Sequence, residues 1–348
     1  MIKKKTALIY HKDYLLHNAT LHHPERKERL IRTLEYFKEK GIFERISILT
    51  PDMATEKDLL RVHTMRHVEF IKNFCFSGGG FIDADTFANE KTYEIAKLAA
   101  GGVMLASNAV ANEKFNNSFA LVRPPGHHAC SDRAMGFCYF NNVAIAIRYL
   151  QEKFSIKKIF LVDWDVHAAN GTMEIFYDDP TVLNISLHQD PKNFYPGTGF
   201  IEQIGVGRGE GYTVNIPMQP NSGNSDYLYI FHEFILPLID SFKPELIVIS
   251  AGQDSHKDDP LGSIKLTEQA YGEMTSLLRK KAEQFCNGKI FVELEGGYNL
   301  EALAKSNYEI VLALLGEFSE KIPSNGILSS TKETLKKLKE IFSRYHKI

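Results

Sequence analysis

Four short segments of this sequence carry side chains that could do chemistry, and each of them directly follows an apolar run. They hold a histidine pair, two aspartates with a third histidine, one further aspartate, and one tyrosine. In chain order the segments are 123–128, 163–167, 251–254 and 295–298. Imidazoles, carboxylates and a phenol are groups that hold catalytic metal ions and move protons. Their recurrence after four apolar runs predicts a metal site with acid–base groups beside it.

The two middle segments offer metal ligands. Asp165 and His167 are two residues apart, so they project to the same side if the strand geometry continues through them. Asp254, which follows another apolar run, is the natural third ligand. Two carboxylates and one imidazole would hold Zn²⁺ or Fe²⁺ with an open coordination position, as catalytic sites do. Taken singly, such residues also occur as helix caps or as a buried histidine, and the presence of four clusters favours the metal site.

The two outer segments offer groups for acid–base chemistry. The rigid Pro-Pro-Gly turn at 124–126 comes straight after an apolar run, and it sets where the rings of His127 and His128 point. In the last segment a Gly-Gly pair lets the backbone approach closely and presents the phenol of Tyr298 at a strand end. Tyr298 is therefore a candidate hydrogen-bond donor to an oxyanion.

Short apolar, β-branched runs recur along the chain with segments of helical period between them. This alternation is typical of a mostly parallel sheet with helices on both faces. In such α/β sheets, functional residues gather beyond the carboxyl ends of the strands, which is where the four segments lie. The eight predicted strands are 6–10, 46–49, 119–122, 159–162, 182–187, 212–216, 246–250 and 290–294.

The composition is that of an ordinary globular protein. Of 348 residues, 44% are apolar and 24% are charged, and the formal net charge is −2, so nucleic acid is not an expected partner. The longest apolar runs are about 5 to 7 residues, whereas a membrane span needs about 20, so no membrane partner is expected either. Four scattered cysteines without a Cys-x-x-Cys pair favour a reducing compartment. We expect a cytoplasmic protein, and the sequence indicates no oligomeric state.

We expect one catalytic domain over residues 1–348. No linker rich in Pro, Ser or Gly divides the chain, and the core is predicted over about residues 6–315. The last stretch, about 331–348, carries six basic and two acidic residues around Leu335, Leu338, Phe342 and Tyr345. Its pattern predicts a C-terminal amphipathic helix packed on the domain.

Six motifs follow one another in a fixed order. They are Arg-Pro-Pro-Gly-His-His at 123–128, Gly-Phe-Cys-Tyr-Phe-Asn-Asn at 136–142, the segments 163–171 and 195–199, 250–254 with 259–262, and 294–299. Together they resemble the zinc-dependent histone deacetylase superfamily, and most of all its class II type and prokaryotic relatives such as acetylpolyamine amidohydrolases and acetoin-utilisation proteins. The resemblance runs from about Tyr10 to Leu315. It implies the arginase-like fold, an α/β domain with an eight-stranded, mainly parallel sheet flanked by helices.

The resemblance also implies a role for each site residue. The zinc ligands would be Asp165, His167 and Asp254. The catalytic residues would be His127, His128 and Tyr298, with Asp163 behind His127 and Asn170 behind His128. The acyl-lysine tunnel would be lined by Gly136, Phe137 and Tyr195, with Leu261 at its rim. A structural potassium ion near the zinc would be held by Asp163, Asp165, His167, Ser186 and Leu187.

Departures from the family pattern bear on the site. The family usually has His-Gly where this chain has Ala168-Ala169, and a Gly to Ala change costs little at negative φ and more at positive φ. Gln253 replaces an aromatic residue that is common before the metal-binding aspartate, and together with His256 and Lys257, which follow it, it is expected to make the tunnel rim more polar. Leu261 stands where polyamine-selective relatives can carry an acidic residue, which removes one reason to expect a cationic polyamine substrate.

We therefore expect a zinc-dependent amidohydrolase that removes acetyl or other acyl groups from acetylated lysine, or from an acetylated small amine, by metal-activated water. In this hypothesis His128 takes the proton of the water, and His127 acts mainly through its charge, because an aspartate favours a charged ring and an asparagine does not. Two alternatives stay open: a non-catalytic protein that binds acyl-lysine or a small molecule, and a binuclear arginase-like hydrolase, for which 251–254 offers only one carboxylate. The substrate, and the choice between Zn²⁺ and Fe²⁺, also stay open.

Overall fold

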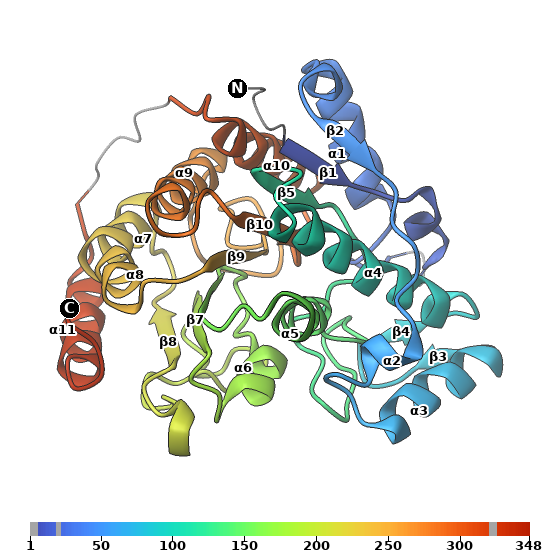
Figure 1. The fold of residues 1–348 in the computed structure, drawn as a ribbon, viewed down its shortest axis with the longest axis horizontal. Helices are drawn as coiled ribbons and strands as arrows, with labels where there is room; N and C mark the ends of the chain where they lie inside the picture. The colour runs from blue at the N-terminus through green and yellow to red at the C-terminus, as the bar shows by residue number, and fades with distance from the viewer. Residues whose placement is uncertain (1–5, 19–21, 320–325) are drawn as a thin grey trace.

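One large parallel sheet organises the structure, a computed structural model that describes residues 6–18, 22–319 and 326–348 (Figure 1). In the described chain the sheet has eight strands in the order β2-β1-β5-β10-β9-β6-β7-β8, and every neighbouring pair is parallel. The predicted α/β class with eight strands is confirmed. The strands are β1 (Thr6–Ile9), β2 (Ser47–Leu49), β5 (Asn117–Ala120), β6 (Ile159–Asp163), β7 (Val182–Gln189), β8 (Thr213–Met218), β9 (Leu246–Ala251) and β10 (Ile290–Leu294).

Helices cover both faces of this sheet, as predicted. Helices α4, α5 and α6 lie on one face and α1, α9 and α10 on the other (Figure 1). The α-helices are α1 (Glu28–Glu39), α2 (Glu56–Leu59), α3 (Met65–Phe76), α4 (Thr92–Ala111), α5 (Asn142–Phe154), α6 (Asn170–Phe176), α7 (Asn224–Ile230), α8 (Leu236–Phe242), α9 (Glu268–Phe285), α10 (Leu300–Leu315) and α11 (Ser329–Phe342). Short 3₁₀ helices span Lys12–Leu16, Ile42–Glu44 and Gly207–Gly209, and a π-helical segment, Phe231–Ile235, joins α7 to α8.

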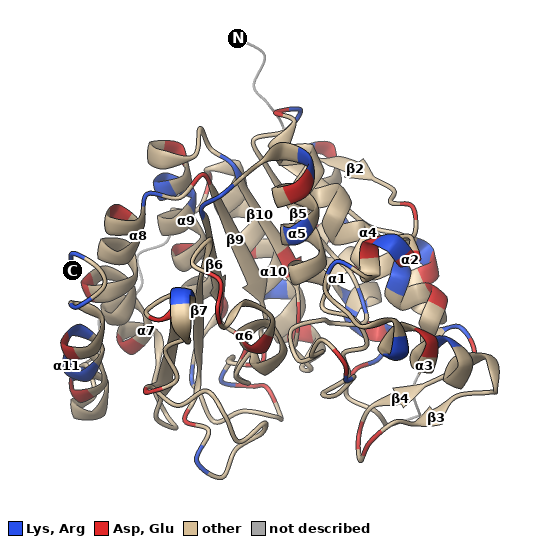
Figure 2. Cartoon of the chain, turned by 60° about the horizontal axis from the view of Figure 1, so that its bottom comes forward, with Lys and Arg blue, Asp and Glu red and all other residues tan. Residues whose placement is uncertain are grey.

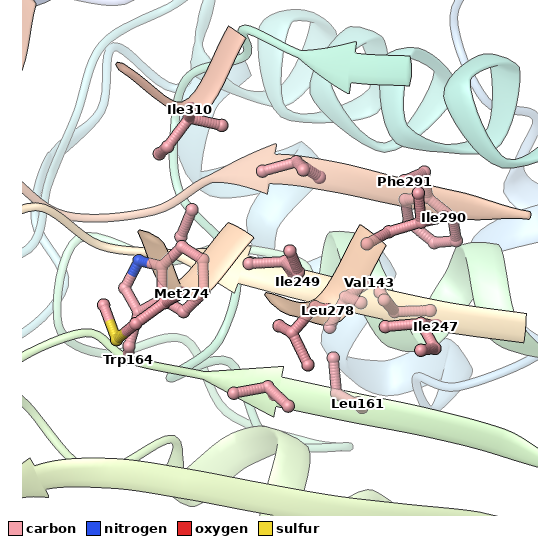
Figure 3. Packing of buried hydrophobic residues seen from close by; sticks show 14 of the residues in the cluster. Val143, Leu161, Trp164, Ile247, Ile249, Met274, Leu278, Ile290, Phe291 and Ile310 are labelled. Atoms are coloured by element: carbon pink, nitrogen blue, oxygen red, sulfur yellow. The ribbon is translucent and has the colours of Figure 1, made fainter. Parts of the chain in front are cut away.

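The central strands are apolar on both faces because helices pack on both sides of them. Figure 3 shows this packing. Leu161 of β6 and Ile247 and Ile249 of β9 lie near Val143 of α5 and Leu278 of α9. All five side chains are fully buried, and each such burial contributes about 1.5 to 3 kcal/mol relative to exposure. This packing makes the middle of the sheet a rigid support for whatever its strand ends carry.

Strand β5 begins and ends two residues earlier than predicted. The prediction was 119–122, but the strand starts at Asn117 and Ser118, whose side chains are polar and buried. The Asn117 amide donates to the carbonyl of Leu314 (2.9 Å), and the Ser118 hydroxyl donates to the carbonyl of Ala106 (2.8 Å). Because neighbouring helices satisfy these groups, polar residues enter a buried strand that an apolar pattern does not reveal.

Helix α11 covers the strand at one edge of the sheet, since it packs against β8. Its buried residues are Thr331, Leu335, Leu338 and Phe342, and the Asp226 carboxylate accepts hydrogen bonds from the Thr331 hydroxyl and from the backbone at the start of the helix. Charges of both signs line its outer side (Figure 2). Covering an edge strand in this way removes a site for unwanted pairing. Among the described residues, no helix combines the length and the apolar character needed to cross a membrane.

A small antiparallel hairpin of strands β3 (Gly80–Phe81) and β4 (Phe87–Ala88) stands apart from the sheet. No such hairpin was predicted, because each strand has only two residues and no alternation to read. Three contacts tie it to the rest of the chain: Tyr139 Oη donates to Phe87 O (2.5 Å), Phe137 N donates to Thr86 Oγ1 (3.2 Å), and His23 Nε2 lies 2.8 Å from Asp85 O.

Candidate metal centre and active site

The four segments that carry the candidate metal-binding and catalytic side chains lie close together, because the strands that precede them are neighbours in the sheet. Strands β5, β10, β9 and β6 stand side by side in the middle of the sheet, so their carboxyl ends open into one space. Asp163, the last residue of β6, is paired in register with Ser250 of β9 on one side and with Ser186 of β7 on the other. The loops that follow these strands carry all of the predicted metal ligands and catalytic groups to the same end of the sheet.

Asp165, His167 and Asp254 form a compact group of potential metal ligands. His167 Nδ1 lies 3.1 Å from Asp165 Oδ1 and 3.2 Å from Asp254 Oδ2, and one ligand atom from each residue lies within 4.8 Å of the other two. The two carboxylates are buried, and His167 is 12% exposed toward the pocket. The loop after β6 supplies two members of the group and the loop after β9 supplies the third.

The surroundings of these three residues fit a divalent cation. Asp254 Oδ2 is buried and has no hydrogen-bond partner within the described chain, although it lies in a close charge contact with His167 Nδ1 (3.2 Å). Two glycines leave room for the group, because a Cβ on Gly252 would lie 2.1 Å from Asp165 Oδ2, and one on Gly296 would lie 2.3 Å from Asp254 Oδ2. Two carboxylates with one imidazole are a donor set that suits Zn²⁺ or Fe²⁺.

The pKa shifts of these residues also favour a bound cation. Burial raises the pKa of Asp254 to about 8, and the neighbouring Asp165 carboxylate adds to this effect. Burial acts to lower the pKa of His167, but the carboxylates of Asp165 and Asp254 outweigh it and raise that pKa to about 9. Protons thus supply the positive charge that the two acids require, and a metal ion would supply it instead.

His127, Cys138 and Glu295 form a second group of possible ligands in the described residues, but they are less suited to a metal ion. Glu295 Oε2 already accepts hydrogen bonds from the backbone amides of Gly126 (2.7 Å) and His127 (3.2 Å). Burial raises the pKa of the Cys138 thiol well above its usual value, whereas metal binding needs the thiolate. The Asp165 group remains the candidate metal site.

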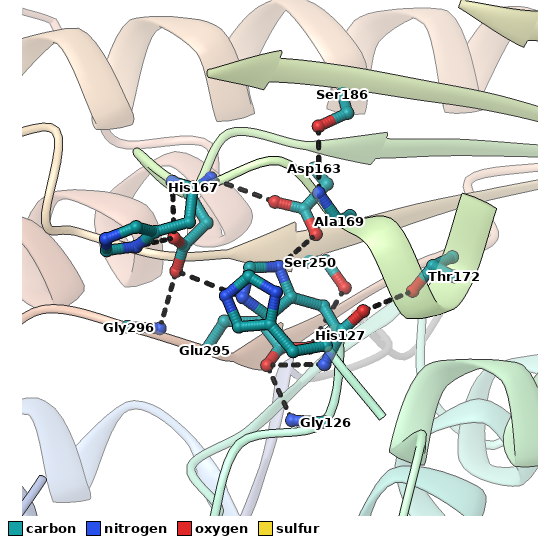
Figure 4. A network of polar contacts seen from close by, with 12 residues as sticks. Gly126, His127, Asp163, His167, Ala169, Thr172, Ser186, Ser250, Glu295 and Gly296 are labelled. Atoms are coloured by element: carbon teal, nitrogen blue, oxygen red, sulfur yellow. Dashed lines mark hydrogen bonds and ion pairs between the residues drawn. The ribbon is translucent and has the colours of Figure 1, made fainter. Parts of the chain in front are cut away.

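The paired histidines have different neighbours. His127 Nδ1 lies 3.0 Å from Asp163 Oδ2, and His128 Nδ1 lies 2.6 Å from Asn170 Oδ1. The two rings are 4.0 Å apart between centroids. Figure 4 shows His127 within the network that joins Asp163, Ser250 and Glu295. These are the partners that the resemblance implied for each ring.

The groups around the two histidine rings give them different charges. Burial acts to lower the pKa of His127, but the negative charges of Asp165, Asp163 and Glu295 outweigh it and raise that pKa well above its usual value. The pKa of His128 is lowered, first by burial and then by the positive charge of His127. His127 is therefore the charged ring of the pair, and His128 is the neutral one.

Tyr298 points its phenol into the same space from the loop after β10. Its hydroxyl makes no hydrogen bond to any residue that the structure describes, and burial raises its pKa well above 10, so the group stays protonated. Arg29 supports the loop from behind: its Nε donates to Gly297 O (2.7 Å) and its Nη2 to Glu295 O (2.5 Å), and its guanidinium carbon lies 5.1 Å from the centre of the phenol ring. The phenol is a free donor on a well-supported loop.

These groups lie in a pocket of about 450 Å³ with an apolar lining. Of the predicted residues, the pocket is lined by His128, Gly136, Phe137, His167, Tyr195, Leu261 and Tyr298. It is also lined by five residues for which the sequence predicted no individual role, namely His23, Pro24, Asp85, Asn193 and Phe194.

Gly136 is required where it stands, because its φ is +57° and a Cβ would lie 2.4 Å from His128 Cδ2. The next residue, Phe137, also has a positive φ, +67°, which is unfavourable for a side chain of this size. Its ring packs edge-on against Tyr298, with 5.8 Å between centroids, while Tyr195 packs edge-on against His128 at 5.1 Å. Backbone strain of this kind is typical of functional sites, and here it aims an aromatic wall into the pocket.

Phe194 was missed although it directly precedes Tyr195 in a motif. Its ring lies parallel to that of His167 at 5.1 Å, so it packs against a potential metal ligand. Asp85 and His23 lie on the hairpin turn and on an irregular segment, where no periodic pattern marks them. The adjacency of Phe194 to Tyr195 was the one usable signal.

The structure shows how the residues that depart from the family pattern are accommodated. Ala169 has φ −74°, so alanine fits there without strain. The expected polar rim is wrong for Gln253 and His256, which are 1% and 2% exposed. Lys257 is exposed but is not among the residues that line the pocket. The Gln253 amide lies against Asn307 (3.0 Å), and His256 Nε2 lies 3.3 Å from Glu268. Both side chains are turned into the protein and do not reach the pocket.

The residues expected to hold a potassium ion lie around the end of β6. Asp163 and Ser186 are directly opposite each other on neighbouring strands, and Asp163 Oδ1 accepts a hydrogen bond from Asp165 N (2.9 Å). Ser186 Oγ lies 2.8 Å from His188 Nδ1, and Leu187 is fully buried beside it. The potassium site stays a prediction.

Comparisons with known proteins agree with this geometry. Residues 23–314 match the family model described as the histone deacetylase domain. The chain is 45% identical over 314 residues to a probable deacetylase of Archaeoglobus fulgidus, covering 89% of this chain and 86% of that one. It is 38% identical over 276 residues to a histone deacetylase-like amidohydrolase of Pseudomonas aeruginosa, covering 79% of this chain and 72% of that one.

A solved structure, the crystal structure of the HDA15 HD domain, superposes with a TM-score of 0.92 at 36% identity and covers 98% of this chain and 95% of its own. The match extends over both the sheet and the loops at its carboxyl end. Fold, motifs and relatives lead to one conclusion: this chain belongs to the histone deacetylase domain family.

Proposed function

We propose that this protein is a zinc-dependent deacylase that hydrolyses the amide of an acylated lysine, or of a related acylated amine. The observation that carries the proposal is the joint position of three residues, Asp165, His167 and Asp254, beside a neutral histidine and a free phenol at one apolar pocket. The names of the two relatives, deacetylase and amidohydrolase, describe the same class of reaction.

Asp165, His167 and Asp254 would hold the metal ion. A divalent ion bound there supplies a Lewis acid that polarises an amide carbonyl and lowers the pKa of a water. The two carboxylates balance its charge, and the shell around them is fixed, because Gly296 N donates to Asp165 Oδ2 (2.9 Å) and Val166 N donates to Asp254 Oδ1 (2.8 Å). These backbone donors hold each carboxylate in one orientation.

His128 is the proton carrier in this proposal. Because it is neutral and lines the pocket, it can accept a proton from the attacking water and pass it to the leaving amine nitrogen. Asn170 orients its ring without adding charge. His127, charged and paired with Asp163, contributes a positive field and keeps the pKa of its neighbour low.

Tyr298 stabilises the negative charge that develops on the amide oxygen. Its hydroxyl is protonated and free within the described chain, so it can donate a hydrogen bond that strengthens as the carbonyl becomes an oxyanion. Removing a donor of this kind typically lowers kcat by about 10² to 10³-fold.

The walls of the pocket suit an aliphatic stem. Phe137 and Tyr195 stand at its sides and Leu261 at its rim, so an acyl amide carried on methylene groups would bury apolar surface on the way in. Acylated lysine in a protein or peptide has such a stem, as does an acylated small amine.

Replacing Phe137 or Tyr195 with alanine should raise KM for an acetyl-lysine substrate, because each change removes apolar contact worth about 1 to 3 kcal/mol. Initial rates over a range of substrate concentrations measure the effect. Phe76→Ala serves as the control, since Phe76 lies on α3 and is 60% exposed. Wild-type kcat/KM in both pocket variants would contradict the proposed tunnel.

Replacing Asn170 with aspartate should move the acidic limb of the kcat/KM profile to higher pH. The new carboxylate would lie beside His128 Nδ1 and favour the charged ring, so the pKa of His128 rises and the neutral base is lost at a higher pH than in the wild type. The profile is compared with that of Asn116→Asp, the same change at an exposed position. An unmoved acidic limb in a folded Asn170→Asp protein means that His128 is not the titrating base.

A substrate panel tests the proposed function as a whole. Zinc-loaded protein is incubated with acetyl-lysine peptides, longer acyl-lysine peptides and acetylated small amines, and released acid is measured. We expect turnover of at least one class. Tight binding without any release would favour the non-catalytic alternative, and two bound metal ions per chain would favour the binuclear one.

A further inference from the structure

Asp259 joins the two loops that carry the rim of the pocket and its phenol. Its side chain is 7% exposed, and its carboxylate accepts three backbone hydrogen bonds. Oδ2 accepts from Tyr298 N (2.7 Å) and Asn299 N (3.1 Å), while Oδ1 accepts from Leu261 N (3.0 Å). One oxygen therefore serves the loop after β10, and the other serves the loop after β9.

The phenol-bearing loop needs such a hold, because its own backbone has little preference for one conformation. Tyr298 follows two glycines, and Gly297 has φ +116°, a region that only glycine adopts readily. The tip of the side chain does not fix the loop either, since the Tyr298 hydroxyl has no hydrogen-bond partner among the described residues. Apart from the contacts of the ring with Phe137 and Arg29, the direction of the phenol is therefore set at the backbone.

Two residues hold that backbone, and they do so with opposite polarity. Asp259 accepts from the amides that come after the glycines, and Arg29 donates to the carbonyls of Glu295 and Gly297. Beyond Tyr298 the chain enters α10 directly, where Asn299 caps the helix by accepting from Ala302 N (3.1 Å). Of the two clamping residues, only Asp259 also contacts the rim, through the amide of Leu261.

We propose that Asp259 is a positioning residue that aims the Tyr298 phenol at the reacting carbonyl and keeps it in register with the rim of the pocket. This inference rests on the proposed function, because it requires Tyr298 to act as an oxyanion donor. A donor displaced by about 1 Å can cost about 10²-fold in rate, so the effect of losing Asp259 appears in kcat.

Asp259→Asn is the main test variant. The amide keeps the size of the side chain but has one accepting oxygen in place of two, so it satisfies one loop and opposes an N–H of the other with its own NH₂. We expect kcat for an acetyl-lysine peptide to fall about 10- to 100-fold, with KM within about threefold. Asp258→Asn, the same change at the exposed neighbouring residue, should behave as wild type. Metal content and hydroxamate affinity should match wild type in both variants.

A double-mutant cycle with Tyr298→Phe separates positioning from general damage. If Asp259 acts through the phenol, then Asp259→Asn should cause no further loss of kcat once the hydroxyl is gone. Losses that multiply in the double variant would overturn the inference, as would wild-type kcat in Asp259→Asn. If Asp259→Asn does not fold, Asp259→Glu, which keeps both oxygens but displaces them by one methylene group, enters the same cycle.

The outcomes also distinguish this inference from the proposed function. An inactive wild-type protein with zinc bound would overturn both. An active wild type with an unimpaired Tyr298→Phe variant would remove the role of the phenol and, with it, that of Asp259. An active wild type, an impaired Tyr298→Phe and multiplying losses would overturn the positioning role alone.

Discussion

Asp254→Ala should abolish both metal retention and activity. The variant keeps only Asp165 and His167 of the three-residue group, and a catalytic site of this type needs three protein ligands. The metal content of purified protein and the release of acetate from an acetyl-lysine peptide measure the two effects. Activity should fall to background even when zinc is present in the assay at one equivalent.

Asp258→Ala provides the matched control, because Asp258 lies four residues further along and its side chain is 59% exposed. It should retain metal and activity. Stoichiometric zinc in the Asp254→Ala protein would show that the metal is held elsewhere, and the His127, Cys138 and Glu295 group would then be the first place to look.

His128→Ala should lower kcat by about 10² to 10⁴-fold, the usual contribution of a general base, while zinc stays bound and a hydroxamate inhibitor still binds. The reason is that His128 lies beside the three proposed metal ligands, with its ring 5.8 Å from that of His167, and is not itself a proposed ligand. His127→Ala should have the milder effect, since His127 contributes charge and does not carry the proton. Steady-state rates, metal content and inhibitor titration distinguish the cases.

His232→Ala is the control for the loss of a histidine, because His232 is exposed and lies in the π-helical segment far from the pocket in the sequence. Loss of zinc from His128→Ala would contradict its assignment as a base, and a larger loss of kcat in His127→Ala than in His128→Ala would reverse the roles of the two rings.

The sheet could be predicted from the sequence because its strands are short, apolar and separated by helical segments. Strand β10 was predicted to the residue, and β6 and β9 to within one. The start of β5 was missed because Asn117 and Ser118 are satisfied by helices far away in the sequence. The β3–β4 hairpin was missed because its four residues are too few to show a period.

The residues at the strand ends could be predicted for a similar reason: parallel strands bring their carboxyl ends together, so polar groups after four central strands must meet. Residues that support the site from other directions have no such marker. Arg29 lies on α1 and reaches the loop after β10 across more than 260 positions in the chain, and Asp259 works through backbone amides, which any residue type provides. Gln253 was misjudged because its neighbour in space, Asn307, is not visible from its neighbours in sequence.

The most direct test of the proposed chemistry is a zinc titration of metal-free protein, with acetate release from an acetyl-lysine peptide as the readout. A site with the three proposed ligands and the one proposed base predicts that activity appears with the first zinc added and stops rising at one equivalent per chain. Full zinc occupancy without acetate release, or activity that appears only with a second equivalent, would contradict the account.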